Sequence, residues 1–142
     1  MQLSTKGRYA VMAMTDLALR ETDRAAPLAA IAERQQISQP YLEQLFARLR
    51  RAGLVRSVRG PGGGYRLARP AADLSVAEVI SAVDEPLKVT RCEAEGPGCL
   101  KGGARCVTHQ LWEETGRRLY AYLASISLAD VTTGRVIAED RP

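Results

Sequence analysis

The segment from Cys92 to His109 places the tightest constraint on how this chain can fold. It contains all three cysteines and the only histidine of the 142 residues, at the spacing Cys-x6-Cys-x6-Cys-x2-His. Five glycines and prolines lie between these side chains, and they interrupt a helix but let the backbone wrap closely around a small object. The candidate ligands are Cys92, Cys99, Cys106 and His109. We therefore expect a loop that binds a metal centre.

Three thiols and one imidazole fit two kinds of metal centre. One is a tetrahedral zinc ion, and the other is an iron–sulfur cluster in which a histidine replaces one thiolate. The two six-residue gaps argue modestly against zinc, because zinc sites usually contain cysteines separated by about two to four residues. A third interpretation, unrelated surface thiols, is disfavoured because free cysteine is usually buried and a charged, glycine-rich loop buries it poorly.

Length and hydropathy indicate one globular domain, or one domain with a projecting helix. Hydrophobic residues make up 46% of the chain, but no apolar run approaches the roughly 20 residues of a membrane span. An odd number of cysteines in such a chain favours metal or redox chemistry over disulfides. The sequence therefore predicts a cytoplasmic protein with no membrane contact.

Charge is distributed unevenly between the two halves. Residues 1–70 contain 12 Lys and Arg against 5 acids, whereas residues 71–142 contain 8 against 11. Between Glu43 and Asp73 there are seven arginines and no acidic residue. Scattered arginines often form only a solvated surface, but this run is suited to a phosphate-bearing partner, and nucleic acid is the partner we expect.

Two short helices are predicted over residues 28–36 and 38–52. Ser38 can cap the second helix, Pro40 is acceptable in its first turn, and Gly53 follows its end. Its apolar residues share one face, while polar and basic residues occupy the other. A pair of this kind is typical of a helix-turn-helix, in which the second helix reads the major groove.

The next segment predicts a β-hairpin. Residues 54–58 and 65–68 favour strands, and the glycine-rich residues 60–64 join them. The glycines do not form a nucleotide-binding P-loop, because no Lys-Ser/Thr pair follows them and they lead into a strand. A hairpin after a recognition helix is the wing of a winged helix, and Arg59 at its tip suits a narrow minor groove.

These patterns define a set of candidate DNA-binding residues. Two of them, Lys6 and Arg8, lie in the first turn of a helix predicted from about Thr5 to Glu21, where positive charge opposes the helix dipole unless DNA phosphates are near. The full set is Lys6, Arg8, Ser38, Gln39, Pro40, Glu43, Gln44, Arg50, Arg51, Arg59 and Gly60.

A longer helix is predicted from about His109, and its apolar side chains recur at intervals of three or four residues. Since the winged domain already has a core of its own, this stripe favours packing on a second copy. The predicted dimer face consists of Trp112, Thr115, Leu119, Tyr122 and Ile126. A shorter helix before the cysteine loop carries a capping box, Ser75 with Glu78.

The predicted fold is mainly α with a small β wing: a winged helix-turn-helix domain plus a long dimerisation helix. We expect the winged domain over residues 1–84, the Cys/His cluster-binding loop over 85–109, the dimerisation helix and a following turn over 110–131, and a flexible tail over 132–142.

Several stretches together resemble the Rrf2 family of transcription regulators. They are LSTKGRYAVMAM, ISQPYLEQLFARLRRAGLV, SVRGPGGGYRLA, EVISAVDE and the Cys/His loop, and the likeness covers nearly the whole chain. The resemblance implies a homodimer that binds a pseudo-palindromic operator in double-stranded DNA. It also implies a [2Fe–2S] cluster on Cys92, Cys99, Cys106 and His109, received from the iron–sulfur assembly machinery.

On this interpretation the protein controls iron–sulfur cluster assembly genes and changes its choice of operator with cluster occupancy. Nitric-oxide-sensing repressors of the same family are the alternative; they use a carboxylate of the N-terminal helix as a ligand, where this chain has Lys6-Gly7-Arg8. A zinc-stapled DNA-binding protein is a second alternative. An enzyme using Cys106 and His109 is disfavoured, because no third group is placed to orient the imidazole.

Overall fold

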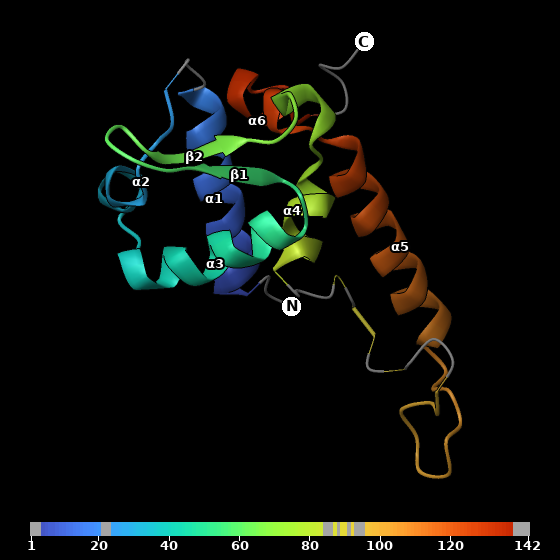
Figure 1. Cartoon of the computed structure of the whole chain (residues 1–142). Coiled ribbons are helices and arrows are strands. Elements are labelled where there is room, and N and C mark those ends of the chain that lie inside the picture. Colours follow the sequence, from blue (N-terminus) through green and yellow to red (C-terminus); the bar gives the residue numbers. More distant parts are fainter. Residues whose placement is uncertain are drawn as a thin grey trace.

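The computed structural model describes residues 4–20, 24–83, 87, 89–90, 92 and 96–137. The elements are α1 (Thr5–Leu19), α2 (Leu28–Gln35), α3 (Gln39–Arg51), β1 (Val55–Val58), β2 (Gly64–Leu67), a 3-10 turn η1 (Ala71–Asp73), α4 (Val76–Ala82), α5 (His109–Ser125) and α6 (Leu128–Thr133). Figure 1 shows α5 extending as an arm from a group formed by the other elements. The predicted fold class, mainly helical with a two-stranded β wing, is confirmed.

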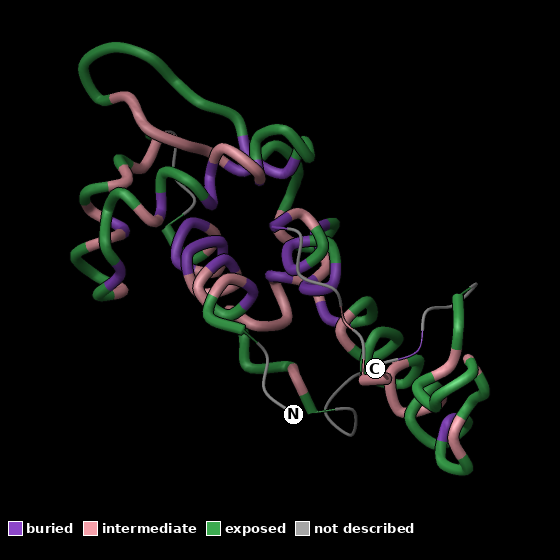
Figure 2. The backbone as a smooth tube through the Cα atoms, turned by 90° about the horizontal axis from the view of Figure 1, so that it is seen from below, coloured by how far each residue is buried: buried purple, intermediate pink, exposed green. Residues whose placement is uncertain are grey.

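A single hydrophobic core holds α1, α2, α3 and the hairpin together. The apolar face predicted for α3 is buried in it, and Phe46 is 0% exposed. The Phe46 ring packs on Tyr65 of β2 with a centroid distance of 4.9 Å. Figure 2 shows that buried segments concentrate where these helices meet. Burying a side chain such as Phe46 stabilises the fold by roughly 1.5–3 kcal/mol.

Two helix caps predicted from the sequence are present. The Ser38 hydroxyl accepts a hydrogen bond from the Tyr41 backbone N–H at 3.2 Å and so caps α3. Ser75 and Glu78 form a reciprocal box at α4, with the Glu78 N–H donating to Ser75 Oγ at 3.1 Å and the Ser75 N–H donating to the Glu78 carboxylate at 3.0 Å. Each cap satisfies backbone N–H groups that have no partner inside the helix.

The predicted hairpin forms, and a third segment extends it. Strands β1 and β2 pair antiparallel from Val55 opposite Leu67 to Val58 opposite Gly64. Ala26, in the link between α1 and α2, exchanges two backbone hydrogen bonds with Tyr65, at 2.9 and 2.8 Å. A Cβ on Gly64 would lie 2.2 Å from the Ala26 carbonyl oxygen, so only glycine permits this approach. The wing is therefore anchored to the helical core.

A buried ion pair joins α1 to α2. Asp16 is 2% exposed, and its carboxylate accepts hydrogen bonds from Arg34 at 2.7 and 3.0 Å and from Gln35 at 2.7 Å. Burial by itself would raise the pKa of Asp16, but the hydrogen bonds from Arg34 and Gln35 and the charges of Arg34 and Arg20 together lower that pKa below its ordinary value. The ionised carboxylate thus belongs to the helix-turn-helix scaffold.

Helix α6 was not predicted from the sequence, and it crosses the boundary predicted at residue 132 between the dimerisation segment and a flexible tail. Its start is capped by a box in which Ser127 accepts from Asp130 N–H at 3.0 Å and Asp130 accepts from Ser127 N–H at 2.9 Å. Leu128 is fully buried in the core shared with α1 and α3. The core of the winged domain therefore includes a residue beyond the predicted boundary at 84. Of the predicted tail, residues 138–142 lie outside the described residues.

Ile126 departs from its predicted place on the dimer face. Helix α5 ends at Ser125, and Ile126 turns inward, where it is 2% exposed and packs with Val76 and Ile80. Its carbonyl accepts a hydrogen bond from Val76 N–H at 2.8 Å, and the Leu128 N–H donates to Leu74 at 2.9 Å. The apolar periodicity continues through residue 126, but the end of the helix turns this side chain into its own chain's core.

Candidate metal centre and nucleic-acid interface

Helix α3 presents the residues predicted to read DNA on its outer face. Gln39, Pro40, Glu43 and Gln44 are exposed, whereas the apolar residues between them are buried. This arrangement follows from the 3.6-residue period, which places one stripe against the core and leaves the other in water. Ser38 is also exposed, and its oxygen accepts the capping hydrogen bond. Arg50 and Arg51 are exposed in the last turn of the same helix.

The second turn of α1 lies close to the start of α3. Tyr9 and Tyr41 meet edge to face, with ring centroids 6.0 Å apart. Tyr41 is in the first turn of α3, so this contact brings the turn that carries Lys6 and Arg8 toward the same end of the recognition helix. Two segments that lie far apart in the sequence can thus face one DNA partner.

The tertiary structure divides the arginine run between Glu43 and Asp73 into groups with different surroundings. Arg48 donates a hydrogen bond to the Val83 carbonyl at 3.2 Å and so joins α3 to the end of α4. Arg69 forms an ion pair with Glu78 at 2.7 Å. Arg56 and Arg66 lie opposite each other on the hairpin. These arginines form one run in the sequence. Of them, Arg50, Arg51 and Arg59 belong to the predicted set of DNA-binding residues.

The tip of the wing is exposed, and its shape depends on glycine. Arg59 and Gly60 are both exposed, and Gly60 has a φ of 94°. A Cβ on Gly63 would lie 2.4 Å from the Val58 carbonyl oxygen. The glycines thus let the turn close tightly, and Arg59 lies exposed at its tip.

The described part of the cysteine loop is a tight turn rather than a helix. Gly98 N–H donates to the Gly103 carbonyl at 2.7 Å, and Leu100 N–H donates to the Ala104 carbonyl at 3.1 Å. A Cβ on Gly98 would lie 2.2 Å from the Ala104 carbonyl oxygen. These contacts fold residues 98–104 back on themselves, with Cys99 within the turn and Cys106 two residues beyond it.

The three cysteines are free thiols in different surroundings. Cys92 is buried, Cys99 is exposed and Cys106 is half-buried. A hydrogen bond with Cys106 raises the pKa of the Cys99 thiol, and the Cys92 side chain adds to this increase. The Thr108 hydroxyl lowers the pKa of Cys106, followed by the Cys99 thiol. The thiols of Cys99 and Cys106 therefore influence each other's protonation.

His109 is the most informative of the four candidate ligands. It opens α5, is only 6% exposed, and neither of its ring nitrogens has a hydrogen-bond partner among the described residues. Glu113 is 3.9 Å from Nε2, which is too long for a hydrogen bond. Burying polar atoms without partners costs about 1–3 kcal/mol, and a metal bond would offset that cost.

The side chains are not drawn together around an ion. Over the described residues, no three histidine, cysteine or carboxylate side chains lie close enough to hold a metal. The donor chemistry nevertheless fits a cluster, since the set offers three thiols and one imidazole with unpaired nitrogens. The carboxylate alternative lacks support, because the single acid of α1 is Asp16 and it is already bound by Arg34.

Thr108 is a residue that the sequence analysis missed. Its hydroxyl lies 3.4 Å from Cys106 Sγ and accepts a hydrogen bond from the Trp112 indole N–H at 3.1 Å. It therefore links a candidate ligand to the predicted dimer face. A threonine at the start of a helix signals only an N-cap in the sequence, and here its side chain makes no such cap.

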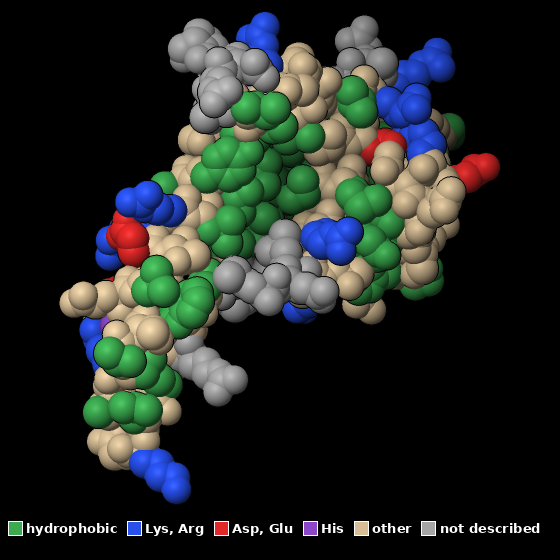
Figure 3. All heavy atoms as spheres, turned by 180° about the vertical axis from the view of Figure 1, so that it is seen from behind, with side chains coloured by type: hydrophobic (Ala, Val, Ile, Leu, Met, Phe, Trp, Pro, Cys, Tyr) green, Lys and Arg blue, Asp and Glu red, His purple; other side chains and the backbone are tan. Residues whose placement is uncertain are grey.

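The predicted dimer face on α5 is largely exposed. Trp112 is 39% exposed, and Leu119 and Tyr122 are also exposed, while Thr115 is half-buried and bonds the Leu111 carbonyl at 2.8 Å. Of the 17 residues of α5, only His109 is buried. Figure 3 shows hydrophobic side chains along this arm and in the hollow beside it. An exposed apolar face of this kind is typical of a surface that packs against another protein chain.

Comparison with known proteins establishes the family. The family model described as "Iron-dependent Transcriptional regulator", Rrf2, matches residues 3–134. The chain belongs to the Rrf2 family. It is 54% identical over 139 residues to the HTH-type transcriptional regulator IscR of Xenorhabdus nematophila, covering 98% of this chain and 84% of that protein. It is 52% identical over the same length to IscR of Klebsiella pneumoniae, with the same coverage.

Solved structures of Rrf2 proteins have the same architecture. T. potens IscR superimposes with a TM-score of 0.76 at 43% identity, covering 95% of this chain and 88% of that one. CymR, the global cysteine regulator of B. subtilis, superimposes with a TM-score of 0.79 at 29% identity, covering 94% and 98%. This chain is accordingly an HTH-type transcriptional regulator rather than an enzyme. None of its described helices has the length and hydropathy of a membrane span.

Proposed function

We propose that this Rrf2 regulator senses the supply of iron–sulfur clusters through a [2Fe–2S] cluster held by Cys92, Cys99, Cys106 and His109. The observation that carries the proposal is the buried His109 imidazole, whose two nitrogens lack hydrogen-bond partners among the described residues. The relatives named IscR support a role in iron–sulfur metabolism. When bound, the cluster supplies an occupancy signal that depends on cluster availability.

The DNA-binding unit is a homodimer on a pseudo-palindromic operator. The outer face of α3 enters the major groove with Glu43 and Gln44, and Arg59 reaches the adjacent minor groove. The α5 faces of two copies pack together and set the distance between the recognition helices. Cytoplasmic iron–sulfur assembly machinery donates the cluster, and the regulated genes are those of cluster assembly.

The proposed link between the two functions runs through Thr108. One hydroxyl contacts Cys106 Sγ at 3.4 Å and the Trp112 indole at 3.1 Å. A change in the position of Cys106 on ligand binding would therefore shift the Trp112 ring on the dimer face. The expected result is a change in half-site geometry, so that the cluster-bound form binds one class of operators that the cluster-free form binds poorly.

Cluster identity is tested on protein purified without oxygen. We expect a red-brown protein with about two iron and two sulfide per chain. Cys92→Ala, Cys99→Ala and Cys106→Ala should each abolish the colour. His109→Cys should retain colour and lower the reduction potential, because an added thiolate makes the cluster more negative. Stoichiometric zinc without iron would contradict the cluster and would indicate a zinc-stapled DNA-binding protein instead.

Operator choice is tested by fluorescence anisotropy on a fixed panel of operators at one salt concentration. The Cys92→Ala/Cys99→Ala/Cys106→Ala variant should bind a subset of sites and discriminate less than the cluster-bound protein. Thr108→Val should keep the visible spectrum but reduce the difference between the two forms, while Thr133→Val, which removes a hydroxyl from α6, should not. Identical affinity rankings for both forms would show that the loop does not regulate DNA choice.

Glu43 is the proposed selectivity residue. Its carboxylate is exposed on the outer face of α3, where it is repelled by phosphates but can accept a hydrogen bond from a cytosine amine. Glu43→Ala should change relative affinities across the panel by up to about 1–3 kcal/mol per contacted base pair. Arg50→Ala should weaken all sites similarly and reduce the salt slope by about one unit. A Glu43→Ala protein with unchanged relative affinities would contradict this role.

A further inference from the structure

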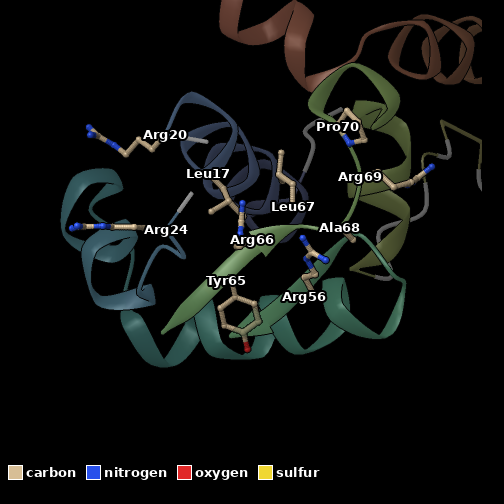
Figure 4. A pocket seen from close by; sticks show the side chains of 10 residues that line it. All are labelled: Leu17, Arg20, Arg24, Arg56, Tyr65, Arg66, Leu67, Ala68, Arg69 and Pro70. Carbon is tan, nitrogen blue, oxygen red and sulfur yellow. The ribbon is translucent and has the colours of Figure 1, made fainter. Parts of the chain in front are cut away.

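Arg48 belongs to the arginine run that follows Glu43, but its side chain is bonded within its own chain. It is half-buried, whereas its neighbours Arg50 and Arg51 are exposed. Its guanidinium donates a hydrogen bond to the Val83 carbonyl at 3.2 Å. Figure 4 shows the arginines farther along the run, which lie around a cavity between the hairpin and the end of α1: Arg56, Arg66 and Arg69. The charge of Arg48 is thus directed at a protein carbonyl, on another helix, rather than at a DNA phosphate.

The Val83 carbonyl is a group that requires such a donor. Val83 is the C-cap of α4 and is 0% exposed. The last carbonyls of a helix have no partner inside that helix, and buried carbonyls in proteins are nearly always hydrogen-bonded. An arginine side chain can satisfy them. Arg48 therefore caps α4 from the recognition helix, and the bond joins the two helices at a defined point.

The opposite end of α4 is bonded to the arm. The Val76 N–H donates to the carbonyl of Ile126, one residue past the end of α5, at 2.8 Å. Val76 and Ile80 pack with Ile126. Val79 and Val83 lie in the core shared with α1 and α3. Helix α4 thus connects the recognition helix with the arm, and Figure 1 shows it between α3 and α5.

We propose that Arg48 is a positioning residue, which fixes the direction of the recognition helix relative to the arm by bonding the end of α4. This inference rests on the proposed dimer. When the α5 faces of two copies pack together, the angle between α3 and the arm sets the distance between the two recognition helices. Arg48 thereby determines which separation of half-sites the protein accepts, without contacting DNA.

A hydrogen bond can fix this direction more closely than apolar packing does. Leu45 and Leu49, on either side of Arg48 in the sequence, are buried and hold α3 in the core. Burial of apolar surface is non-directional, whereas a hydrogen bond weakens steeply when its donor is misaligned. The bond from Arg48 lies in the last turns of α3, where a small rotation would move the outer face of the helix.

The test compares a full operator with a single half-site by fluorescence anisotropy. The probes are the tightest duplex that the unmodified full-length protein selects from random sequence, copies with the half-sites moved closer or farther apart by a base pair, and one isolated half-site. Arg48→Met should weaken the full operator by about fivefold to tenfold and reduce the preference for one spacing. Half-site affinity should change less than about twofold, because the outer face of α3 is unaltered.

Salt dependence separates a positioning role from a phosphate contact. Loss of one phosphate contact reduces the slope of log affinity against log salt by about one unit. Arg50→Met should show this reduction on the half-site, whereas Arg48→Met should change the slope by less than about a third of a unit. Arg48→Lys retains a charged donor and should recover most of the spacing preference.

Arg69→Met is the matched control at α4. Arg69 follows the hairpin, outside α3, and its guanidinium forms an ion pair with Glu78 in the first turn of α4 at 2.7 Å. The variant removes an arginine from the same helix but leaves α3 bonded to its end. Full-operator affinity should therefore change less than about twofold.

Two results with Arg48→Met would overturn the proposal. Equal weakening of half-site and full operator with a lower salt slope would show a phosphate contact, and unchanged affinity and spacing preference would show that the core alone positions α3. Urea unfolding confirms that each variant is folded during titration, and Arg48→Gln repeats the test with a shorter neutral side chain. Absence of any spacing preference in the unmodified protein would instead contradict the proposed dimer, and the inference with it.

Discussion

The winged part of the chain and the α5 arm are built in opposite ways. In the winged part, α1, α3 and the hairpin bury a shared core that includes Phe46 at 0% exposure. Along the arm, most of the large apolar side chains are exposed, Leu123 is half-buried, and His109 is the one buried residue of the helix. The first region buries its apolar side chains within its own chain, whereas the second leaves an apolar face for the partner copy that we propose. On that proposal, the difference separates a stably packed DNA-binding domain from an arm whose packing depends on a second copy.

The largest expected effect is on the core of the winged part. Phe46→Ala should destabilise the fold by about 3–5 kcal/mol, since it removes the contact with Tyr65 and leaves a cavity. Urea unfolding followed by circular dichroism measures it. Trp112→Ala, the matched aromatic truncation on the arm, should leave the unfolding of the winged part nearly unchanged and instead weaken the proposed dimer in sedimentation experiments. Equal destabilisation by both would contradict the division into two regions.

The ion pair between α1 and α2 should have the next largest effect. Asp16→Asn should cost about 2 kcal/mol, less than the roughly 3–5 kcal/mol of a fully buried pair because Arg34 remains partly in water. The folded-state pKa of Asp16 lies below the unfolded value of about 3.9. Its contribution is therefore complete above about pH 5 and is lost as the pH falls through the folded pKa.

Urea unfolding between pH 7 and pH 2 tests this dependence. The stability difference between the unmodified protein and Asp16→Asn should shrink as the pH falls below about 4. Asp73→Asn changes an exposed carboxylate of η1 and should show a smaller effect. A difference that stays constant across this range would mean that the ionised carboxylate of Asp16 is not the stabilising species.

A smaller effect is expected where the winged part continues into α4. Ser75→Ala should cost about 1 kcal/mol, because it removes the side-chain acceptor for the Glu78 N–H. Ser81→Ala, on the exposed side of the same helix, should be neutral or slightly stabilising, since alanine favours helix. Chemical denaturation of both variants gives the comparison, and equal effects would mean that the cap does not limit the stability of α4.

The smallest effect on stability should come from the cysteine loop. Cys92→Ala/Cys99→Ala/Cys106→Ala should change the free energy of unfolding by less than about 1 kcal/mol, because the core of the winged part lies elsewhere. A zinc finger, by contrast, unfolds without its metal. Circular dichroism and urea unfolding of the variant beside cluster-free protein test this, and loss of helical signal would show that the loop is part of the fold.

Local patterns determined much of the winged part. The apolar stripe of α3, the Ser38 cap, the Ser75 and Glu78 box and the glycine turn of the wing were all predictable, because each depends on residues within a few positions of one another. The cysteine and histidine spacing likewise identified the candidate ligands. The burial of the His109 imidazole without a hydrogen-bond partner among the described residues became visible only in the structure.

Tertiary structure alone decided how distant segments combine. The sequence predicted Ile126 on a dimer face and a frayed end after residue 131, but the chain turns at Ser125 and α6 packs back on α1. The seven arginines between Glu43 and Asp73 form one run in the sequence, yet Arg48 and Arg69 bind within the domain while Arg56 and Arg66 line a cavity. Periodicity and caps are local properties and can be read from the chain, whereas the partner of a charged side chain depends on which elements the fold brings together.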